Sequence, residues 1–281
     1  MENYINFLKK KEYHKAIEFI SKIDTSINEI KDKFGYTMLY FAVLELNKEI
    51  IELLLKKGAD INKKYINGNT VLHEAIKKNS PEIIKLLLDN DADIFIENHS
   101  SISPVDLTIE TGNIDIFKII IENNVNKQAK NGDTILMKVI IKLFTNEREL
   151  VMTQKWKTDH NTWVFGNTDE YYYRKKDIFL QMFKTLLEKN ADIDTIENNG
   201  YNEKRTKYTA LTLVEDYYKN QCIPFNKEIK EYLETELHQR RNLLFLYSYI
   251  NRERDNDTIL SDIHGSLLDD DAIISKILDY I

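Results

Sequence analysis

The sequence predicts an all-α protein in which pairs of helices stack in a row. Residues 34–66 and 67–98 carry the same motif twice, and the matching residues are Gly35 and Gly68, Thr37 and Thr70, Leu39 and Leu72, and Ala42 and Ala75. Each match is 33 residues apart, and within each copy the apolar residues recur at helical spacing. One helix pair cannot bury both of its faces, so the copies are expected to stack on one another.

Each copy is expected to begin with a helix capped by a threonine. Thr70 precedes an apolar run, and its hydroxyl can accept hydrogen bonds from the free amides at a helix N-terminus. Leu72, Ala75 and Ile76 follow at helical spacing and form one apolar stripe. The small alanine at this position lets the paired helices approach closely.

A second helix is expected after a short turn. Ser80 stands at its expected cap and Pro81 in its first turn, where proline is favoured. The run from Ile83 to Leu88 makes this helix apolar over a broad face. In the first copy Gly58 ends the equivalent helix, since glycine adopts a left-handed cap at little cost.

These motifs resemble those of ankyrin repeats. Residues 70–75, TVLHEA, are similar to the family motif TPLHxA, and residues 57–62, KGADIN, contain the family's GADIN. The resemblance implies a solenoid that binds a protein through its loop tips and inner helices. It also implies a structural role for His73, which would form hydrogen bonds within and between repeats. A metal-ligand or proton-transfer role is the alternative.

The repeat pattern predicts three segments. Residues 1–31 are expected to be a degenerate N-terminal capping repeat, residues 32–241 about five ankyrin repeats, and residues 242–281 a helical C-terminal tail. Strong repeats span about 32–64 and 65–97, and further repeats begin at Asn98, Asn131 and Asn199. A terminal repeat of atypical sequence is needed because an internal one would expose its stacking face.

The fourth repeat is expected to carry an insertion at about residues 145–179. Ala92 to Ala191 spans 99 residues, whereas two repeats of 33 and 31 residues predict 64, so about 35 residues are inserted. Both tryptophans, Trp156 and Trp163, fall in this segment. Two interpretations are open: the aromatic side chains pack back on the solenoid, or they form a binding protrusion, since tryptophan and tyrosine dominate interface hot spots.

The end of the tail has two interpretations as well. Residues 267–281 are similar to the opening of an F-box, with matches at Leu267, Lys276, Ile277, Leu278 and Tyr280. Some viral ankyrin proteins end in such a truncated, F-box-like (PRANC) segment. That resemblance implies a host-interaction protein of a virus or an intracellular parasite, or an adaptor that docks a Skp1-like ubiquitin-ligase subunit. The alternative is an amphipathic helix that caps the last repeat.

Net charge, cysteine content and the motifs found in the sequence narrow the function classes, and no enzymatic activity is expected. The net charge of −7 and the mixed charges make nucleic acid an unlikely main partner, because phosphate binding needs a basic face. Cys222 is the only cysteine. With no intramolecular disulfide, no secretory signal and no apolar run long enough to span a membrane, a cytoplasmic location is expected, with the nucleus as the alternative. The resemblance to viral ankyrin proteins implies the cytoplasm or nucleus of a host cell. No metal, cofactor or catalytic motif is found, so none is expected.

The candidate protein-binding residues lie on the expected loop tips and inner helices. They are Lys33, Phe34, Tyr36, Leu44, Glu45, Ile66, Asn67, Asn69, Lys77, Lys78, His99, Ile102 and Glu110, together with Trp156 and Trp163 of the insertion. Phe34, Tyr36 and Ile66 are expected to be the main anchors, since apolar groups placed in solvent indicate a partner. Each of the three alone could instead pack against the next loop.

Overall fold

The computed structural model describes residues 1–23, 26–143, 145–146, 168–192, 197–198, 207–208 and 235. The chain divides into two units, Met1–Ala210 and Leu211–Ile281. Apart from Thr235, every described residue belongs to the first unit. In the described part of the chain, no helix has the length and apolar character needed to cross a membrane.

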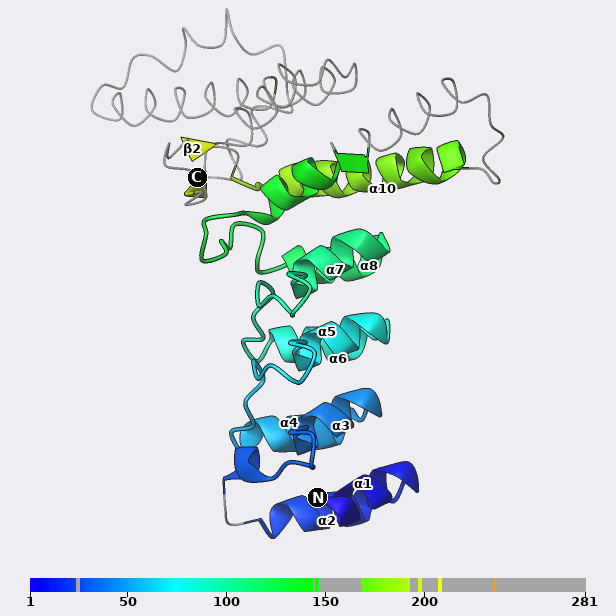
Figure 1. Cartoon of the computed structure of the whole chain (residues 1–281), viewed down its shortest axis with the longest axis vertical. Helices are drawn as coiled ribbons and strands as arrows, with labels where there is room; N and C mark the ends of the chain where they lie inside the picture. The colour runs from blue at the N-terminus through cyan, green and yellow to red at the C-terminus, as the bar shows by residue number, and fades with distance from the viewer. Residues whose placement is uncertain are drawn as a thin grey trace, which may run out of the picture. The chain divides into compact units, whose positions relative to one another are not determined.

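The first unit is a stack of helix pairs (Figure 1). In order, its elements are α1 (Glu2–Lys9) and α2 (Tyr13–Ser21), the 3-10 turn η1 (Ile27–Glu29), α3 (Met38–Leu44) and α4 (Lys48–Lys56), α5 (Val71–Lys77) and α6 (Pro81–Leu88), α7 (Pro104–Thr111) and α8 (Ile114–Ile121), a helix at residues 135–143, and α10 (Thr168–Glu188). The two-residue strands β1 (Glu197–Asn198) and β2 (Lys207–Tyr208) pair antiparallel.

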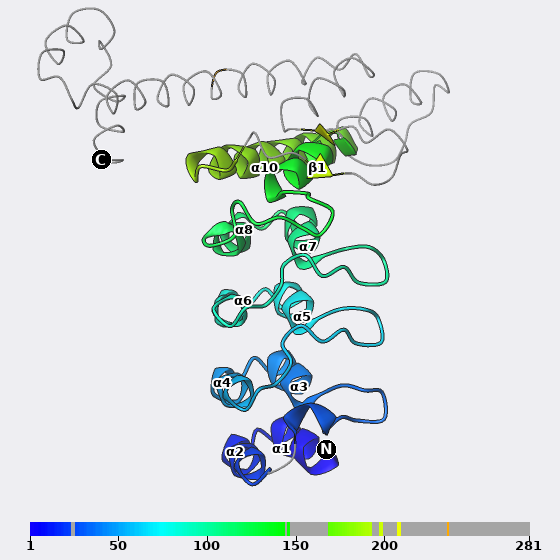
Figure 2. The ribbon, with the colours of Figure 1, turned by 90° about the vertical axis from the view of Figure 1, so that its left-hand side faces the viewer.

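The helices form two columns. Figure 2 shows α1, α3, α5 and α7 in one column and α2, α4, α6 and α8 in the other, with the loops before α3, α5 and α7 projecting beyond the first column. Within each column a helix contacts the next one, as α3 contacts α5 and α6 contacts α8. The predicted all-α solenoid of stacked helix pairs is therefore confirmed; the count of about five repeats depends on residues outside the described ones.

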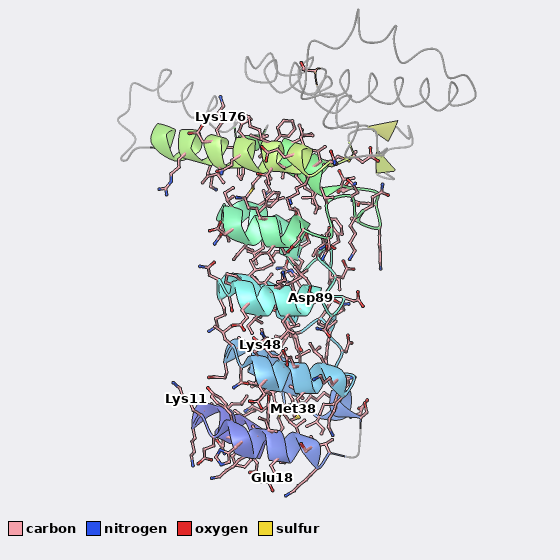
Figure 3. The ribbon with its side chains drawn as sticks, turned by 180° about the vertical axis from the view of Figure 1, so that it is seen from behind. Lys11, Glu18, Met38, Lys48, Asp89 and Lys176 are labelled. Carbon is pink, nitrogen blue, oxygen red and sulfur yellow. The ribbon has the colours of Figure 1, made fainter. Side chains whose placement is uncertain are left out.

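The core is distributed along the stack, in the spaces between successive helix pairs (Figure 3). Met38, labelled there, is fully buried, and the Tyr4 hydroxyl donates a hydrogen bond of 3.0 Å to its carbonyl oxygen. Leu54 and Leu87, on α4 and α6, are fully buried as well. Each pair thus covers the apolar surface of its neighbour, which is why a single pair could not fold alone.

The predicted caps of the first-column helices are present. The Thr37 hydroxyl accepts from the amide of Tyr40, and Ser103 and Asp106 form a reciprocal capping box at the start of α7. Thr70 and His73 form a capping box at the start of α5. Since these groups satisfy amides that have no partner within the helix, each repeat fixes where its first helix begins.

The second-column helices begin and end as the sequence indicated, with one difference. Pro81 occupies the first turn of α6, but the Ser80 side chain at the cap position forms no hydrogen bond to the helix. Asn47 caps α4 in that way, its side chain accepting from the amide of Ile50 at 3.0 Å. Gly58 follows α4 with a φ of 80°, which confirms its left-handed conformation.

Asparagine side chains link successive helix pairs beyond the second column. The amide of Asn62 donates to the carbonyl of Asp91 at 3.2 Å and its oxygen accepts from the backbone amide of Asp93 at 2.8 Å. Asn28 and Asn126 each form the same pair of bonds with the following helix pair. These links hold the loops after α2, α4 and α8 against the next repeat.

The predicted insertion lengthens the second helix of the fourth repeat. Helix α10 begins at Thr168, inside the segment 145–179, and continues to Glu188 without a break. Phe179 is buried, and the side chain of Ile178 lies so close to Gly112 that a Cβ there would meet it at 3.3 Å. The extension therefore packs on the third repeat. Trp156, Trp163 and the tail 242–281 lie outside the described residues, and the predicted segment boundaries remain predictions.

Candidate interaction surface

Four finger loops of one geometry precede the first-column helices. We define them as residues 31–37, 64–70, 97–103 and 128–134. In the second finger loop the amide of Tyr65 donates to the carbonyl of Asn69 at 3.0 Å, and the amide of Gly68 donates to the carbonyl of Tyr65 at 2.8 Å. The same two bonds recur in the other loops, starting from Asp32, Asn98 and Ala129. The repeated sequence therefore folds into a row of equivalent turns on one side of the solenoid.

One position in each finger loop needs a left-handed backbone. Gly35, Gly68 and Gly132 occupy it with φ of 83°, 77° and 93°, and Ser101 occupies it with φ of 56°. A side chain is disfavoured in this conformation. At Gly68 space is also restricted, because an added Cβ would lie 2.5 Å from the amide nitrogen of His99 in the next loop.

Aromatic side chains gather where the first and second finger loops meet α3. We call Tyr36, Tyr40, Phe41 and Tyr65 the aromatic cluster. Tyr36 stacks on Tyr65 with ring centroids 5.4 Å apart, and Tyr40 lies 4.3 Å from Tyr36 and 4.7 Å from Tyr65. Aromatic contacts at such distances contribute about 0.5–1.5 kcal/mol beyond burial. The cluster is thus a rigid feature that joins two adjacent repeats.

Two tyrosine hydroxyls of this cluster, those of Tyr40 and Tyr65, stay protonated. Burial raises the pKa of Tyr40 to about 12, with the Glu74 carboxylate as a further cause. Burial also raises the pKa of Tyr65, whose hydroxyl is 2.7 Å from that of Thr37. The half-buried ring of Tyr40 therefore presents neutral, amphipathic surface rather than charge.

Two large apolar side chains beside the cluster are exposed. Phe34 is 58% exposed and Ile66 is 66% exposed. The only cover over the Phe34 ring given by the described contacts is the Lys33 ammonium, 4.9 Å from its centroid. Neither side chain is thus packed away against the next loop, as the alternative for these anchors required. Leu46, at the other end of α3 and 40% exposed, is the third such residue in the described part.

The other predicted binding residues divide by exposure. Exposed ones are Lys33, Glu45, Asn67, Lys77, Lys78 and His99, and half-buried ones are Tyr36, Leu44, Ile102 and Glu110. The Glu110 carboxylate is 2.7 Å from the Lys142 ammonium, so it is paired within the chain. Whether any of them contacts a partner stays a prediction.

The prediction for Asn69 is wrong. This side chain is only 2% exposed. Its amide donates to the Glu74 carboxylate at 2.7 Å, and its oxygen accepts from the Asn98 amide at 2.8 Å. Asn69 therefore ties two neighbouring finger loops together and is not available as a contact residue.

The structural role of His73 is confirmed. Its Nδ1 accepts from the amide of Thr70 at 3.1 Å, and its Nε2 lies 3.0 Å from the carbonyl oxygen of Ile102 in the next repeat. Because a carbonyl can only accept, Nε2 carries the proton and the ring is neutral. Burial lowers the pKa of His73, in keeping with that neutral form.

Sequence reasoning missed Tyr40 and the buried Tyr65 as parts of the aromatic cluster. Tyr40 follows Tyr36 by four residues, and Tyr65 occupies in the second finger loop the position of Asp32 in the first. These spacings are visible in the sequence, and they are the signal that could have found the cluster. The decisive contact, between Tyr36 and Tyr65, spans two repeats.

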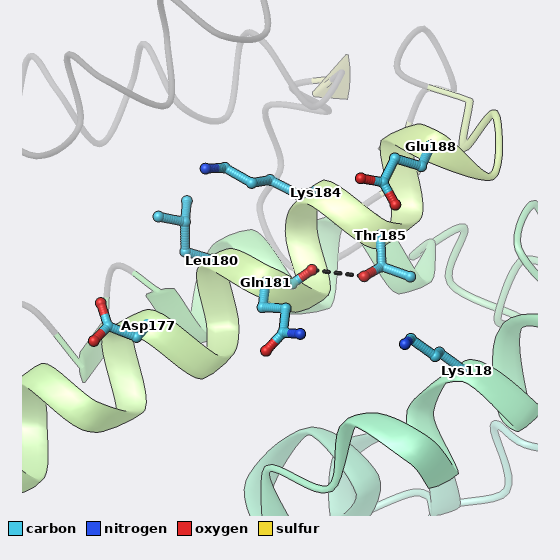
Figure 4. A pocket seen from close by; sticks show the side chains of 7 residues that line it. All are labelled: Lys118, Asp177, Leu180, Gln181, Lys184, Thr185 and Glu188. Carbon is cyan, nitrogen blue, oxygen red and sulfur yellow. Dashed lines mark hydrogen bonds between the residues drawn. The ribbon is translucent and has the colours of Figure 1, made fainter.

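The opposite column carries a hollow of about 400 Å³ between α8 and α10. Its lining side chains, drawn in Figure 4, are Lys118, Asp177, Leu180, Gln181, Lys184, Thr185 and Glu188. The hydrogen bond drawn there runs from the Thr185 hydroxyl to the carbonyl of Gln181 and belongs to the helix itself. The part of the chain that the structure describes holds no cluster of metal-ligating side chains, and this open, charged hollow offers no catalytic arrangement.

Comparison with known proteins agrees with the stacked repeats. The family of ankyrin repeats (three copies) matches residues 8–98, about a third of the chain, so this segment is a set of three ankyrin repeats. The match begins within the predicted N-terminal capping repeat. No curated protein matches the chain. Ankyrin repeats are generally protein–protein interaction modules and typically not enzymes.

Proposed function

We propose that the protein binds a protein partner on the finger surface. This surface consists of residues 31–37, 64–70 and 97–103 with the side of α3, α5 and α7 next to them. The observation that supports it is the exposure of Phe34 and Ile66 beside a rigid aromatic cluster. Buried aromatic and aliphatic anchors supply most of the binding energy at interfaces, and here they stand in solvent.

The ordered aromatic side chains of the finger surface favour binding of a partner over catalysis. Tyr36 and Tyr65 are held by stacking and by the hydroxyl contact with Thr37. Because these side chains are already ordered, they lose little conformational entropy when a partner covers them. The finger surface would therefore act as a preformed platform, with loop residues such as Asn67 and His99 contributing polar contacts at its rim.

The test is the double variant Phe34→Ala/Ile66→Ala in the full chain. A partner recovered by affinity purification from the native cell and titrated against the purified protein should bind at least tenfold more weakly, about 1.4 kcal/mol or more. Leu46→Ala is the matched control, since Leu46 is exposed as well but lies at the other end of α3. Equal affinity of the double variant and the wild type would exclude this surface.

The alternative function is that of a ubiquitin-ligase adaptor in the cytoplasm of a host cell. Its support is the F-box-like sequence of residues 267–281, which would dock a Skp1-like subunit while the repeats select a substrate. This role would suit a protein of a virus or an intracellular parasite. A chain truncated before residue 265 should then lose the ligase subunit and keep the substrate. If no ligase subunit copurifies with the full chain, the adaptor role fails.

A further inference from the structure

Resting on the proposed function, we infer that the partner presents an acidic segment with an aromatic or large aliphatic side chain. The segment crosses the first and second finger loops. Its apolar side chain lies on the aromatic cluster between Phe34 and Ile66, and its carboxylates face the lysines of the two loops. The inference depends on the exposed lysines of the first two finger loops, on their lack of ion pairs, and on the apolar side chains exposed beside the aromatic cluster.

Four lysines lie in or directly before the first two finger loops. Lys31, Lys33 and Lys64 are exposed and Lys63 is half-buried. Within the described ranges, the ion pairs involve none of these four. Exposed lysines that form no ion pair leave a local positive potential that an anionic segment can neutralise.

The acidic residue among them does not offset this potential by ion pairing. The Asp32 carboxylate accepts from the backbone amides of Phe34 and Tyr36, each at 2.9 Å. It is therefore directed into its own loop and fixes the turn. The lysine side chains, by contrast, remain at the surface of the same loops.

Two lysines further along the solenoid are paired. The Lys138 ammonium is 3.0 Å from the Asp106 carboxylate, both being largely buried, and Lys142 pairs with Glu110 at 2.7 Å. The third finger loop begins with Glu97 at the position held by Lys31 and Lys64 in the first two. The third finger loop therefore lacks the cations of the first two, and the fourth, which carries the exposed Lys130, lies away from the aromatic cluster.

The chain has a net charge of −7, but acidic residues far from the finger loops have little effect on such a partner. At physiological ionic strength charges are screened over about 8 Å, so an approaching carboxylate responds mainly to the nearest side chains. Those include the exposed Lys31, Lys33 and Lys64, whereas the Asp32 and Glu74 carboxylates are engaged in hydrogen bonds within the chain. The same screening predicts that binding weakens as salt is added, whereas the apolar contact on Tyr36 and Tyr40 persists.

The apolar anchors favour a peptide over nucleic acid. Phe34 and Ile66 together present two large hydrophobic side chains, and an isoleucine offers no flat surface for base stacking. Phosphate binding would also be expected to use a longer basic stripe, which the third finger loop interrupts with Glu97. A protein segment with both carboxylates and apolar side chains matches both features.

The test is selection of random peptides displayed on phage against the full chain, followed by titration of the synthesised winners. We expect enriched peptides to be acidic and to contain an aromatic or large aliphatic residue. The variant Lys33→Glu/Lys64→Glu should weaken them about tenfold, and so should Phe34→Ala/Ile66→Ala. The control Lys56→Glu/Lys118→Glu makes the same charge change on exposed lysines of α4 and α8 and should have little effect. Circular dichroism establishes that all variants are folded.

The outcomes separate the inference from the function on which it rests. Enriched peptides that are neutral or basic, and that are lost only with Phe34→Ala/Ile66→Ala, would overturn the acidic partner and leave the surface in place. Peptides insensitive to both variants, or no enrichment at all, would overturn the surface itself. A single-stranded oligothymidine that binds more tightly than every peptide, and that Lys33→Glu/Lys64→Glu releases, would assign the surface to nucleic acid and overturn both.

Discussion

Replacing Gly68 with alanine should destabilise the protein more than the same change at Gly35. Both glycines occupy the left-handed position of a finger loop, at φ of 77° and 83°, and alanine in that conformation costs about 1–2 kcal/mol. At Gly35 nothing lies within 4 Å of the added Cβ, so this conformational cost is the whole effect.

At Gly68 the added Cβ also collides with the next loop. It would lie 2.5 Å from the amide nitrogen of His99 and 2.9 Å from the carbonyl carbon of Asn98. These are backbone atoms, so the loop has to move, and the hydrogen bond from the His99 amide to the Asn67 carbonyl, 3.2 Å long, is lost. A lost bond of this kind adds about 1 kcal/mol, which gives a total of about 2.5 kcal/mol for Gly68→Ala.

Urea denaturation of the full chain, followed by circular dichroism, measures the two costs. The free energy of unfolding should fall by about 1.5 kcal/mol for Gly35→Ala and by about 2.5 kcal/mol for Gly68→Ala. Equal losses would show that the second and third finger loops do not touch as described, and the reasoning on their stacking would be refuted.

Three further predictions concern stability. Ser101→Gly should raise the free energy of unfolding by about 1 kcal/mol in urea denaturation, because serine stands at φ of 56° where glycine is favoured; a loss would contradict this. His73 is neutral in the fold and its pKa is lowered by burial, so the unfolded chain takes up a proton near pH 6.5 and stability falls as pH drops below that value. Denaturation midpoints above and below that pH should therefore differ less for His73→Gln than for the wild type. Asn62→Ala should lower stability by about 1–3 kcal/mol, since it leaves the backbone groups of the next repeat without their partner; an unchanged thermal midpoint would show that water replaces the bonds.

The repeat architecture could be predicted because its signals are local. The cap at Thr70, the proline at Pro81 and the left-handed glycine at Gly58 act within a few residues of themselves, so their spacing locates each helix. The repeat period of 33 residues then predicts that the helix pairs stack. The same reasoning gave His73 its structural role, because the residue occupies a fixed place in the motif.

The composition of the finger surface was harder to predict, because its contacts join residues from different repeats. Asn69 is polar and lies in a loop, which favours exposure, yet its partner Asn98 stands 29 residues later and buries it. Tyr65 was overlooked for the same reason, since its stacking partner Tyr36 belongs to the preceding finger loop. The alignment of one repeat with the next predicts which residues are neighbours, but it does not predict which of their side chains are buried.

The extension of α10 and the finger loops lie at opposite ends of the helices. A first-column helix starts at its finger loop and ends at the turn to its partner, so an insertion between the two helices of a pair emerges at the end away from the fingers. Figure 1 shows α10 extending beyond the other helices on the side opposite the loops, and Ile178, against Gly112 at the end of α7, lies near this end. A partner held by Phe34 and Ile66 would therefore leave this extension uncovered. Substitutions in the insertion and in the finger loops should act independently, and coupling between them would require one partner that reaches around the stack.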